Sequence, residues 1–366
     1  MLLESIEAVN FRNLQGEIAA KKGLNVLVGE NGQGKTNWLE AIYVLATTRS
    51  FRTAKLQDTV HFDGNFGFVS GIVEESPEIR RKLQVAIRDS TKSLTVNDKK
   101  EPAQQYLGQL HAVIFNTAEI EVVRGNPEAR RRFLDAGIVS LHPPFVQTFA
   151  DYNRVIKQKN ALLQTARDGN LAMENVAAML GPWNEQLAPL AARIHRARLR
   201  FVERLNTSLE KKLFGREELS IRLLSSLEGK GDLDDYEALI TERLALRIQA
   251  EVVAGYSLIG THRDDLEILF DGHDLRKFGS AGQQRSALLL LQLANITVYH
   301  ATRGEYPLFL LDDIDAELDY TRIGQLLEYL DGKTQTFVTT SKESFVQKFD
   351  ANATVFKVAN GVAKLI

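Results

Sequence analysis

Two patterns of apolar residues divide the chain into an α/β part and a helical part. The segment Leu24-Asn25-Val26-Leu27-Val28 is a short, nearly continuous apolar run followed by glycines, which is typical of a strand buried on both faces. Beyond the glycines, apolar residues return at three- and four-residue spacing, which predicts a helix. These residues are Leu39, Ile42, Tyr43 and Ala46. The segment is therefore predicted to be one strand-loop-helix unit of an α/β fold.

The middle of the chain has a helical pattern. Its apolar residues recur at helical spacing, for example Phe145, Phe149, Tyr152, Ile156, Leu162 and Leu163. Asn126-Pro127-Glu128 offers a capping side chain, a first-turn proline and a first-turn acid, which together predict a helix start. We expect helix breaks at Asp168-Gly169-Asn170 and at Gly181-Pro182, and a short strand around Ser220 to Leu224.

Strand and helix patterns alternate again towards the end of the chain. Leu266, Ile268 and Phe270 alternate with polar residues and lead into the turn Asp271-Gly272. The further elements that we expect are a helix from about Gly282 to Tyr299, strands Leu308 to Leu311 and Thr336 to Thr340, a helix Ile323 to Leu330, and a hairpin turn at Asn360-Gly361. The pattern predicts one α/β domain, residues 1–124 plus 254–366, interrupted by a helical insertion of residues 125–253.

Composition narrows the class of protein. With 366 residues, 44% hydrophobic and 25% charged, the chain can bury a sizeable core and has the make-up of a globular protein. Met1 to Phe11 lack the basic start and apolar run of a secretory signal, and no run reaches the roughly eighteen apolar residues of a membrane helix. The absence of cysteine excludes disulfides and thiolate metal sites and fits a reducing interior. We therefore expect a cytoplasmic protein with no membrane partner.

The distribution of charge leaves nucleic-acid binding open. The formal net charge is -2, whereas nucleic-acid-binding domains usually carry a basic excess. Basic residues nevertheless gather in two places, Arg130 to Arg132 and a predicted helix with Arg193, His195, Arg196, Arg198 and Arg200. Such a run is either a solvated helix face or a phosphate-binding surface, and composition alone does not decide between them.

The glycine-rich loop carries the strongest chemical signal. It matches the phosphate-binding P-loop pattern in Gly29-Glu30-Asn31-Gly32-Gln33-Gly34-Lys35-Thr36 and lies between a predicted strand and a predicted helix. Glycines allow backbone N–H groups to turn inward around phosphates at a helix N-terminus. Lys35 is expected to reach the outer phosphates of ATP, and the Thr36 hydroxyl is expected to ligate Mg2+.

Two further segments fit a nucleotide site. The apolar run before Asp312 and Asp313 predicts a strand that ends in two carboxylates. Beside a P-loop, Asp312 is expected to hold magnesium and Asp313 to polarise the attacking water. Ser280-Ala281-Gly282-Gln283-Gln284-Arg285 opens the apolar helix, and alone it could be an ordinary helix cap or a second phosphate-binding device. Combined with the P-loop, it indicates the signature segment of ABC-type ATPases, which contacts the γ-phosphate held by the other subunit.

At these and other segments the sequence resembles the RecF family. The resemblance rests on Phe11-Arg12-Asn13, the P-loop, Arg49-Ser50-Phe51-Arg52, Gly125-Asn126-Pro127, Arg130-Arg131-Arg132-Phe133-Leu134-Asp135, Gly260-Thr261-His262-Arg263-Asp264-Asp265-Leu266, Gly279 to Arg285, and Leu311 to Asp319. These segments follow the family's order and span most of the chain. The resemblance implies an ABC-type ATPase head, with mixed sheets and a P-loop, into which an α-helical lobe is inserted.

The resemblance also implies an ATP-dependent homodimer that acts in recombinational repair and replication. Ser280, Gly282 and Gln283 would close an ATP sandwich between two copies, and Ala316-Glu317-Leu318-Asp319 would form the D-loop. The dimer would clamp duplex DNA near single-strand gaps and help to load RecA with RecO and RecR proteins. Slow ATP hydrolysis would release the DNA. The chain departs from the family's usual residues at Ala281, Thr261, Ala316 and Asn116-Thr117.

Three other classes of P-loop protein explain less of the sequence. A chromosome-organising ATPase of the SMC or Rad50 kind would carry long coiled coils, whereas the insertion spans only about 130 residues without sustained heptads. A transporter ATPase subunit would have a switch histidine after the Thr336 to Thr340 strand, and none is present. A small-molecule kinase would leave Ser280 to Arg285 without a role.

Two weaker candidates have open roles. His262, Asp264 and Asp265 resemble a metal or acid-base cluster, but no other histidine has ligand spacing to them, and a structural role or a contact across the dimer also fits. Arg12 either approaches the nucleotide or is a surface arginine.

Overall fold

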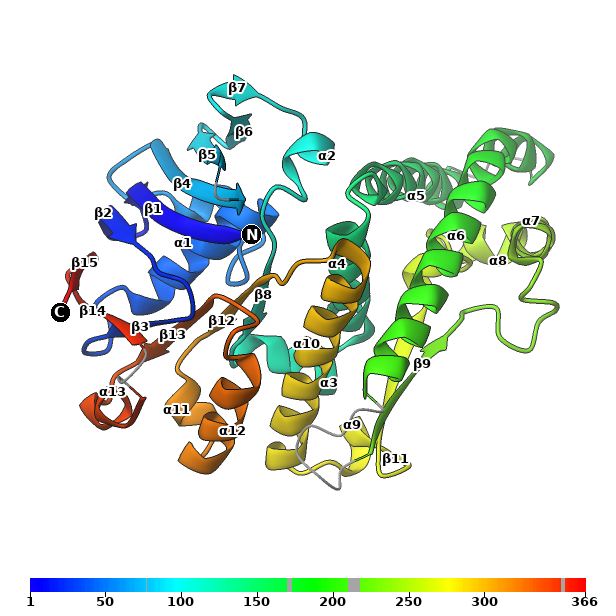
Figure 1. Ribbon diagram of the computed structural model, residues 1–366. Coiled ribbons are helices and arrows are strands. Elements are labelled where there is room, and N and C mark those ends of the chain that lie inside the picture. Colours follow the sequence, from blue (N-terminus) through cyan, green and yellow to red (C-terminus); the bar gives the residue numbers. More distant parts are fainter. Residues whose placement is uncertain (77, 170–172, 210–217, 350–352) are drawn as a thin grey trace. The chain divides into compact units, whose positions relative to one another are not determined.

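Two compact units make up the chain. The first contains Met1–Ile120 and Arg285–Ile366, and the second contains Glu121–Gln284. The computed structural model describes residues 1–76, 78–169, 173–209, 218–349 and 353–366, and Figure 1 labels most of their helices and strands. Among these residues, no helix combines the length and the apolar character needed to cross a membrane.

The first unit contains a six-stranded antiparallel sheet in the order β2-β1-β4-β5-β6-β7. Its strands are β1 (Leu2–Phe11), β2 (Leu14–Ala19), β4 (Phe66–Ser76), β5 (Ile79–Arg88), β6 (Thr91–Val96) and β7 (Lys99–Lys100). Alternate residues such as Leu83, Val85 and Ile87 of β5 are buried, while their neighbours are less buried. One face of the sheet therefore packs on the core, as alternation of apolar and polar residues requires.

A second six-stranded sheet of this unit has the order β15-β14-β3-β13-β12-β8. Its strands are β3 (Leu24–Val28), β8 (Ala112–Phe115), β12 (Leu308–Leu311), β13 (Thr336–Thr340), β14 (Ala353–Ala359) and β15 (Val362–Leu365). All neighbours are parallel except β14 and β15, which form the hairpin expected at Asn360-Gly361. The strands expected at residues 24–28, 308–311 and 336–340 are confirmed. Because parallel strands end at the same edge, the loops after β3 and β12 lie close together.

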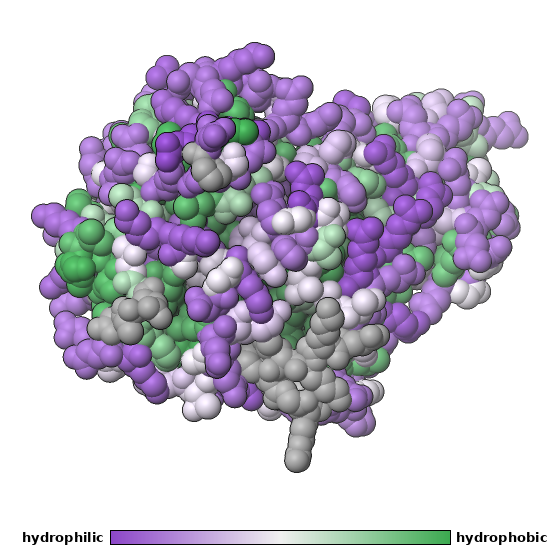
Figure 2. All heavy atoms as spheres, viewed as in Figure 1, coloured by the Kyte–Doolittle hydropathy of each residue, from purple (hydrophilic) through white to green (hydrophobic). Residues whose placement is uncertain are grey.

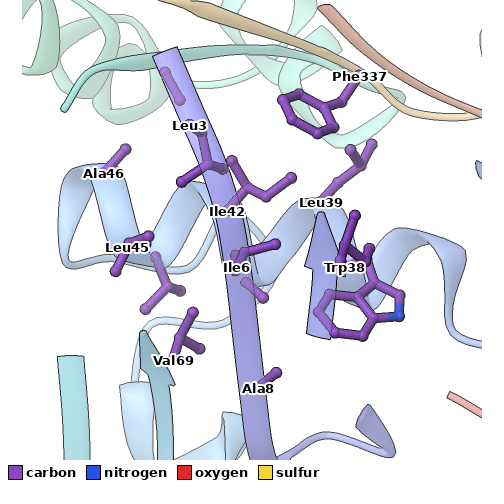
Figure 3. Packing of buried hydrophobic residues seen from close by; sticks show 14 of the residues in the cluster. Leu3, Ile6, Ala8, Trp38, Leu39, Ile42, Leu45, Ala46, Val69 and Phe337 are labelled. Atoms are coloured by element: carbon purple, nitrogen blue, oxygen red, sulfur yellow. The ribbon is translucent and has the colours of Figure 1, made fainter. Parts of the chain in front are cut away.

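Helix α1 (Lys35–Thr47) contacts strands of both sheets and forms the centre of the core. Figure 3 shows Leu39 beside Phe337 of β13, and Leu45 beside Val69 of β4. Full burial of one such side chain contributes about 1.5–3 kcal/mol, so the helix that follows the P-loop is firmly held. Its apolar spacing predicted this helix correctly.

Shorter helices complete the first unit. They are η1 (Leu56–Thr59), α2 (Ala103–Tyr106), η2 (Ala118–Ile120), α11 (Ile314–Glu317), α12 (Tyr320–Leu330) and α13 (Glu343–Phe349). Helix α12 includes the expected residues 323–330 and begins where the Asp319 carboxylate accepts hydrogen bonds from the N–H groups of Thr321 and Arg322. The long helix α10 (Ala281–Arg303) includes the helix expected from about residue 282 to 299 and passes from the second unit into the first.

The second unit is mainly helical. Its helices are α3 (Glu121–Arg124), α4 (Pro127–Leu141), α5 (Phe145–Asp168), α6 (Met173–Leu209), α7 (Tyr236–Leu246), α8 (Ile248–Ala254), η3 (Thr261–Arg263) and α9 (Leu275–Phe278). A small sheet orders β9 (Leu219–Leu224), β10 (Asp265–Phe270) and β11 (His273–Asp274) as β11-β10-β9. The expected strand near residues 220–224 and the turn at Asp271-Gly272 are confirmed. Asn126 caps α4 as predicted, since its side chain accepts from the N–H groups of Glu128 and Ala129.

The helix break expected at Gly181-Pro182 is wrong. Helix α6 continues through Pro182 and also through Pro189. A proline inside a helix costs about 3 kcal/mol, but α6 buries an apolar stripe on both sides of Pro182. The stripe includes Val176, Leu180, Leu187, Ala188 and Ala191. The helix break expected at Asp168-Gly169-Asn170 is confirmed at Asp168, where α5 ends. Asn170 lies outside the described residues.

The boundary between the compact units differs from the expected domain boundary. Residues 254–284, expected in the α/β head, belong to the second unit together with residues 121–124. The reason is local pairing, since β10 pairs with β9 along its whole length and α9 packs on β10. The functional division into a head of residues 1–124 plus 254–366 and an inserted lobe of residues 125–253 stays a prediction.

Candidate nucleotide site

The glycine-rich loop joins β3 to α1 at the edge of the parallel sheet. Gly32 and Gly34 have φ values of 81° and 106°, a left-handed conformation that strongly favours glycine. A Cβ atom on Gly34 would also lie 3.0 Å from Asn13 Oδ1 and 3.2 Å from the Cα of Gly361. Helix α1 begins at Lys35, so the positive end of its dipole faces the loop. The loop therefore has both the shape and the polarity that favour bound phosphate.

Lys35 and Thr36 occupy the first turn of α1. The ammonium group of Lys35 is buried and donates to the carbonyl oxygens of Gly29 and Glu30, at 2.8 and 2.9 Å. The Thr36 hydroxyl donates to Asp312 Oδ1 at 2.9 Å, across 276 positions of sequence. The structure thus brings together the P-loop and the first of the two expected carboxylates.

Asp312 and Asp313 follow β12 directly. Burial raises the pKa of Asp312, and the neighbouring Asp313 raises it further, while hydrogen bonds from Thr339 and Thr36 act in the opposite direction. Burial also raises the pKa of Asp313, and the positive charge of Lys35 partly offsets this. Asp313 has a left-handed φ of 46°, a conformation that aspartate adopts more readily than most residues. Burial disfavours a negative charge on both carboxyl groups, so a cation bound beside them would be stabilising.

Thr339 is a site residue that the sequence analysis missed. Its hydroxyl donates to Asp312 Oδ1 at 2.7 Å and accepts from the N–H group of Asp313 at 2.8 Å. It lies on β13, next to β12, and is fully buried. The sequence did contain a signal for it, because Thr339 and Thr340 are polar residues at the end of a strand that was expected to be buried. Thr339 holds both aspartates in place.

The oxygen atoms around Asp312 fit a magnesium ion. Mg2+ prefers hydroxyl and carboxylate oxygens and keeps several waters, and Thr36 and Asp312 supply two such groups side by side. No described residue donates a hydrogen bond to Asp312 Oδ2, which leaves one carboxylate oxygen for another ligand. The residues present therefore fit the metal that the sequence predicted.

The expected signature segment begins α10. The Ser280 hydroxyl accepts from the N–H group of Gln283 at 3.2 Å, and the Gln283 side chain accepts from the N–H group of Ser280 at 2.9 Å. This reciprocal pair is a capping box. A Cβ atom on Gly282 would have only Ser280 Oγ within 4 Å, at 3.9 Å, so the glycine leaves open space beside the helix end. Contact of Ser280, Gly282 and Gln283 with a nucleotide stays a prediction.

The expected D-loop has identifiable partners within the first unit. Glu317 Oε1 accepts from the Thr117 hydroxyl at 2.8 Å, and Glu317 Oε2 lies 2.8 Å from Arg285 Nε. Arg285 is the last residue of the signature segment. Glu317 therefore links the start of α10 to the loop after β12.

Arg12 is partly exposed and is held by a buried carboxylate of α1. Its guanidinium group donates two hydrogen bonds to the buried carboxylate of Glu40, at 3.0 and 2.9 Å, and a third to the carbonyl of Asp58. Ser50 and Arg52 donate to the same carboxylate, at 2.5 and 3.4 Å. The two motifs around residues 12 and 50 therefore meet at Glu40 on the buried side of α1, a residue that the sequence analysis did not single out.

The side chains of His262, Asp264 and Asp265 are each held by contacts within the second unit. The His262 ring lies 2.8 Å from the Tyr152 hydroxyl and 3.2 Å from the Ser257 carbonyl. Asp264 accepts from the N–H group of Ser226, and Asp265 forms a bidentate pair with Arg130 at 2.6 and 3.0 Å. The three side chains thus have separate partners. Across the described part of the chain, no group of three histidine or acidic residues has the arrangement of a metal site.

The basic run on α6 separates into two sets. His195 and Arg198 are buried, and Arg198 pairs with Asp135 at 2.8 and 2.9 Å. Arg193, Arg196 and Arg200 are exposed at three- and four-residue spacing, which places them on one face of the helix. Arg196 and Arg200 have no ion-pair partner among the described residues.

Comparison with known proteins identifies the family. The family model described as RecF/RecN/SMC N terminal domain matches residues 2–364. The DNA replication and repair protein RecF of Halothermothrix orenii is 33% identical over 99% of this chain and 98% of its own length. The RecF protein of Oceanobacillus iheyensis is 35% identical over 99% of this chain and its whole length.

Solved structures agree with this relationship. A structure of the recombination mediator protein RecF-ATPrS in the RecFOR pathway covers 100% of this chain and 98% of its own, with a TM-score of 0.89 and 30% identity. A structure of RecF-ATP in the same pathway also gives a TM-score of 0.89. The predicted fold class, an α/β ATPase head with mixed sheets and an inserted helical lobe, is confirmed. With a P-loop joined to Asp312 and a match over nearly all residues, the chain belongs to the RecF family.

Proposed function

We propose that this protein is an ATP-dependent DNA-binding switch of recombinational repair and replication. Two copies join around ATP, hold duplex DNA near single-strand gaps, and release it when ATP is hydrolysed slowly. The observation that carries the proposal is the hydrogen bond between Thr36 and Asp312, because it joins a phosphate-binding loop to a carboxylate suited to magnesium. The relatives named DNA replication and repair protein RecF, and the solved RecF-ATP structure, support the same class of function.

The residues of the P-loop divide the work of nucleotide binding. The backbone of Gly29 to Gly34, which includes Glu30, Asn31, Gly32 and Gln33, surrounds the phosphates at the start of α1. Lys35 leaves its carbonyl partners to neutralise the outer phosphates, and Thr36 with Asp312 holds Mg2+. Bound magnesium would neutralise charge on the phosphates during transfer to water. Asp313 orients the water, and an aspartate at this position suits slow hydrolysis.

The second half of the ATP site comes from another copy of the chain. Ser280, Gly282 and Gln283 form a helix start whose N–H groups can face a γ-phosphate bound to the partner copy. The capping box holds Ser280 in place, and the open side of Gly282 admits a ligand close to the backbone. Dimer formation then depends on ATP, because each nucleotide is bound by both copies.

The exposed arginines of α6 are the proposed contact with DNA phosphates. Figure 2 shows mainly hydrophilic residues along the face of α6 turned to the viewer. Arg196 and Arg200 have no carboxylate to neutralise them within the described chain, so their charge remains available for phosphate. Phosphate contacts of this kind bind DNA with little regard to sequence and weaken as salt increases. RecO and RecR proteins, and loading of RecA, complete the proposed pathway.

Sedimentation with and without ATP, repeated with duplex, gapped and single-stranded DNA, tests the proposal. The wild-type chain should sediment as a dimer only with ATP and should retain DNA in that state. Lys35→Ala and Ser280→Arg should each remain monomeric and lose DNA retention. The matched controls are Lys100→Ala and Ser220→Arg, which change exposed residues outside the segments proposed to bind nucleotide. Dimers of either site variant that hold DNA like the wild-type protein would refute the shared ATP site.

A further inference from the structure

The hairpin of β14 and β15 lies against the phosphate loop. Strand β14 is parallel to β3 and adjacent to it, with Lys357 opposite Val28, so both strands end at the same edge of the sheet. The chain leaves β3 as the P-loop and leaves β14 as the turn Asn360-Gly361. These two loops, more than 300 residues apart in sequence, meet at this edge.

Three hydrogen bonds join the turn to the P-loop and to α1. The N–H group of Asn360 donates to Gln33 Oε1 at 2.7 Å, and the N–H group of Gly361 donates to the Gln33 carbonyl at 2.8 Å. The indole N–H of Trp38 donates to the Gly361 carbonyl at 3.1 Å. Figure 3 shows the Trp38 nitrogen on the side of the ring turned away from Ile6 and Ala8 of β1. Gln33 is thus held through both its backbone and its side chain.

Close backbone contacts leave this turn little freedom. Asn360 and Gly361 have left-handed φ values of 49° and 80°, the pattern of a type I′ hairpin turn. A Cβ atom on Gly361 would lie 1.9 Å from the carbonyl oxygen of Asn13, and one on Gly29 would lie 2.3 Å from the carbonyl oxygen of Val358. No side chain fits at either glycine unless backbone moves.

We propose that the Asn360-Gly361 turn and Trp38 are positioning elements of the phosphate loop, which fix Gln33 and Gly34 in the conformation that binds nucleotide. The inference rests on the proposed function, because it assumes that the loop binds ATP. Gly34 has its left-handed φ directly after the residue that the turn holds. Without the turn, the loop would sample other conformations, and nucleotide binding would have to select the competent one, which weakens the apparent affinity.

The substitution Gly361→Ala tests the proposal most directly. It should weaken ATP binding, measured by calorimetry with Mg2+, by at least about tenfold. The matched control is Gly304→Ala, because Gly304 has a similar φ of 77° but no atom within 4 Å of its Cβ position. Both variants carry the strain of a left-handed alanine, whereas only Gly361→Ala displaces the turn. Similar ATP affinities for the two variants, with similar melting temperatures, would overturn the proposal.

A second variant covers the case in which Gly361→Ala does not fold. Trp38→Phe keeps an aromatic ring in the core and removes the donor to the Gly361 carbonyl, and should weaken ATP binding by about 2- to 10-fold. Because coupling is reciprocal, ATP should in turn slow hydrogen exchange of the Asn360 and Gly361 amides in the wild-type protein. Unchanged affinity in Trp38→Phe together with unchanged exchange would overturn the proposal. A wild-type protein that binds no ATP would instead refute the proposed function itself.

Discussion

The two units bury charged groups in different ways. In the second unit, buried charges have partners of opposite charge. Lys159 and Glu251 are both fully buried and lie 2.7 Å apart. The buried Arg198 and Arg130 form bidentate pairs with the partly exposed Asp135 and Asp265, respectively. In the first unit, buried Glu40 is paired in the same way with Arg12, but the charges around the P-loop are not. Lys35 donates to carbonyls, and Asp312 accepts only from hydroxyls among the described residues.

The difference separates charges that hold the fold together from charges at the proposed nucleotide site. Burying an ion without a counter-ion costs several kcal/mol, so proteins usually pair buried charges. A buried carboxylate and a buried ammonium group that stay unpaired beside a glycine-rich loop retain their capacity for a charged ligand. The paired charges of the second unit hold helices and strands together. The unpaired charges of the first unit lie at the proposed nucleotide site.

The largest expected effect comes from breaking the fully buried pair. Lys159→Met should lower the free energy of unfolding by about 3–5 kcal/mol, because Glu251 is left buried without its basic partner. The double variant Lys159→Met/Glu251→Gln should recover much of this loss. Urea denaturation measures both. The control is Arg124→Met, which breaks an exposed pair with Glu121 and should cost less than about 1 kcal/mol. Equal losses of unfolding free energy in Lys159→Met and Arg124→Met would show that the buried Lys159–Glu251 pair stabilises the protein no more than an exposed pair does.

Acid should destabilise the second unit through its buried histidines. Burial lowers the pKa of His262 and His195 to about 4, below the ordinary 6.5, so their neutral forms are favoured in the folded state. Stability from such a group is complete above pH 6.5 and is lost as the pH falls towards 4. Between pH 7.5 and 5.0, His262→Gln should therefore lose about 2 kcal/mol less than the wild-type protein in urea denaturation.

Asp264 acts in the opposite direction. Burial raises its pKa to about 6, so its protonation in the folded state stabilises the protein as the pH falls from 6 towards the ordinary value. The wild-type loss on acidification should thus be smaller than the sum of the histidine contributions. An identical pH dependence in His262→Gln and the wild-type protein would rule out a buried neutral His262.

A smaller effect should distinguish two acidic residues, one in each unit. Asp265→Asn should cost about 1–2 kcal/mol, because Arg130 is buried and loses a charged partner. Asp312→Asn should leave the free energy of unfolding unchanged or raise it, because burial already disfavours the charged form of Asp312. The same variant should lose Mg2+-dependent ATP hydrolysis. If Asp312→Asn destabilised the protein as much as Asp265→Asn, Asp312 would contribute to folding stability in the same way as the paired Asp265, contrary to this prediction.

The smallest expected effect is on the salt dependence of DNA binding, and it comes from the exposed arginines of α6. If Arg196 and Arg200 each neutralise one DNA phosphate, the double variant Arg196→Ala/Arg200→Ala should reduce the slope of log affinity against log salt by about 2. Fluorescence anisotropy with duplex DNA at several salt concentrations measures the slope. The control is Arg154→Ala/Arg167→Ala, whose exposed arginines already pair with Asp151 and Asp168. If the control variant changed the slope equally, Arg196 and Arg200 would not be specific contacts with DNA phosphates.

Local sequence predicted much of the fold because it acts through backbone conformation and short-range periodicity. The residue bounds of β3, β12 and β13 agree with the apolar runs, and Asn126 caps α4 as its position indicated. Gly32, Gly34 and the turn Asn360-Gly361 have the left-handed conformations that their sequences favour. Gly181-Pro182 is the exception, because packing of α6 outweighs a local preference against helix.

What the tertiary structure decided is which distant residues meet. Sequence alone identified Asp312, but the parallel order of β3, β13 and β12 brings it to Thr36 and places Thr339 against both aspartates. The same order sets the Asn360-Gly361 turn on Gln33. One helical run of basic residues likewise became buried Arg198 and exposed Arg196, because only packing decides which helix face is covered. Periodicity gives each segment its conformation, whereas contacts across 300 residues depend on how the segments assemble.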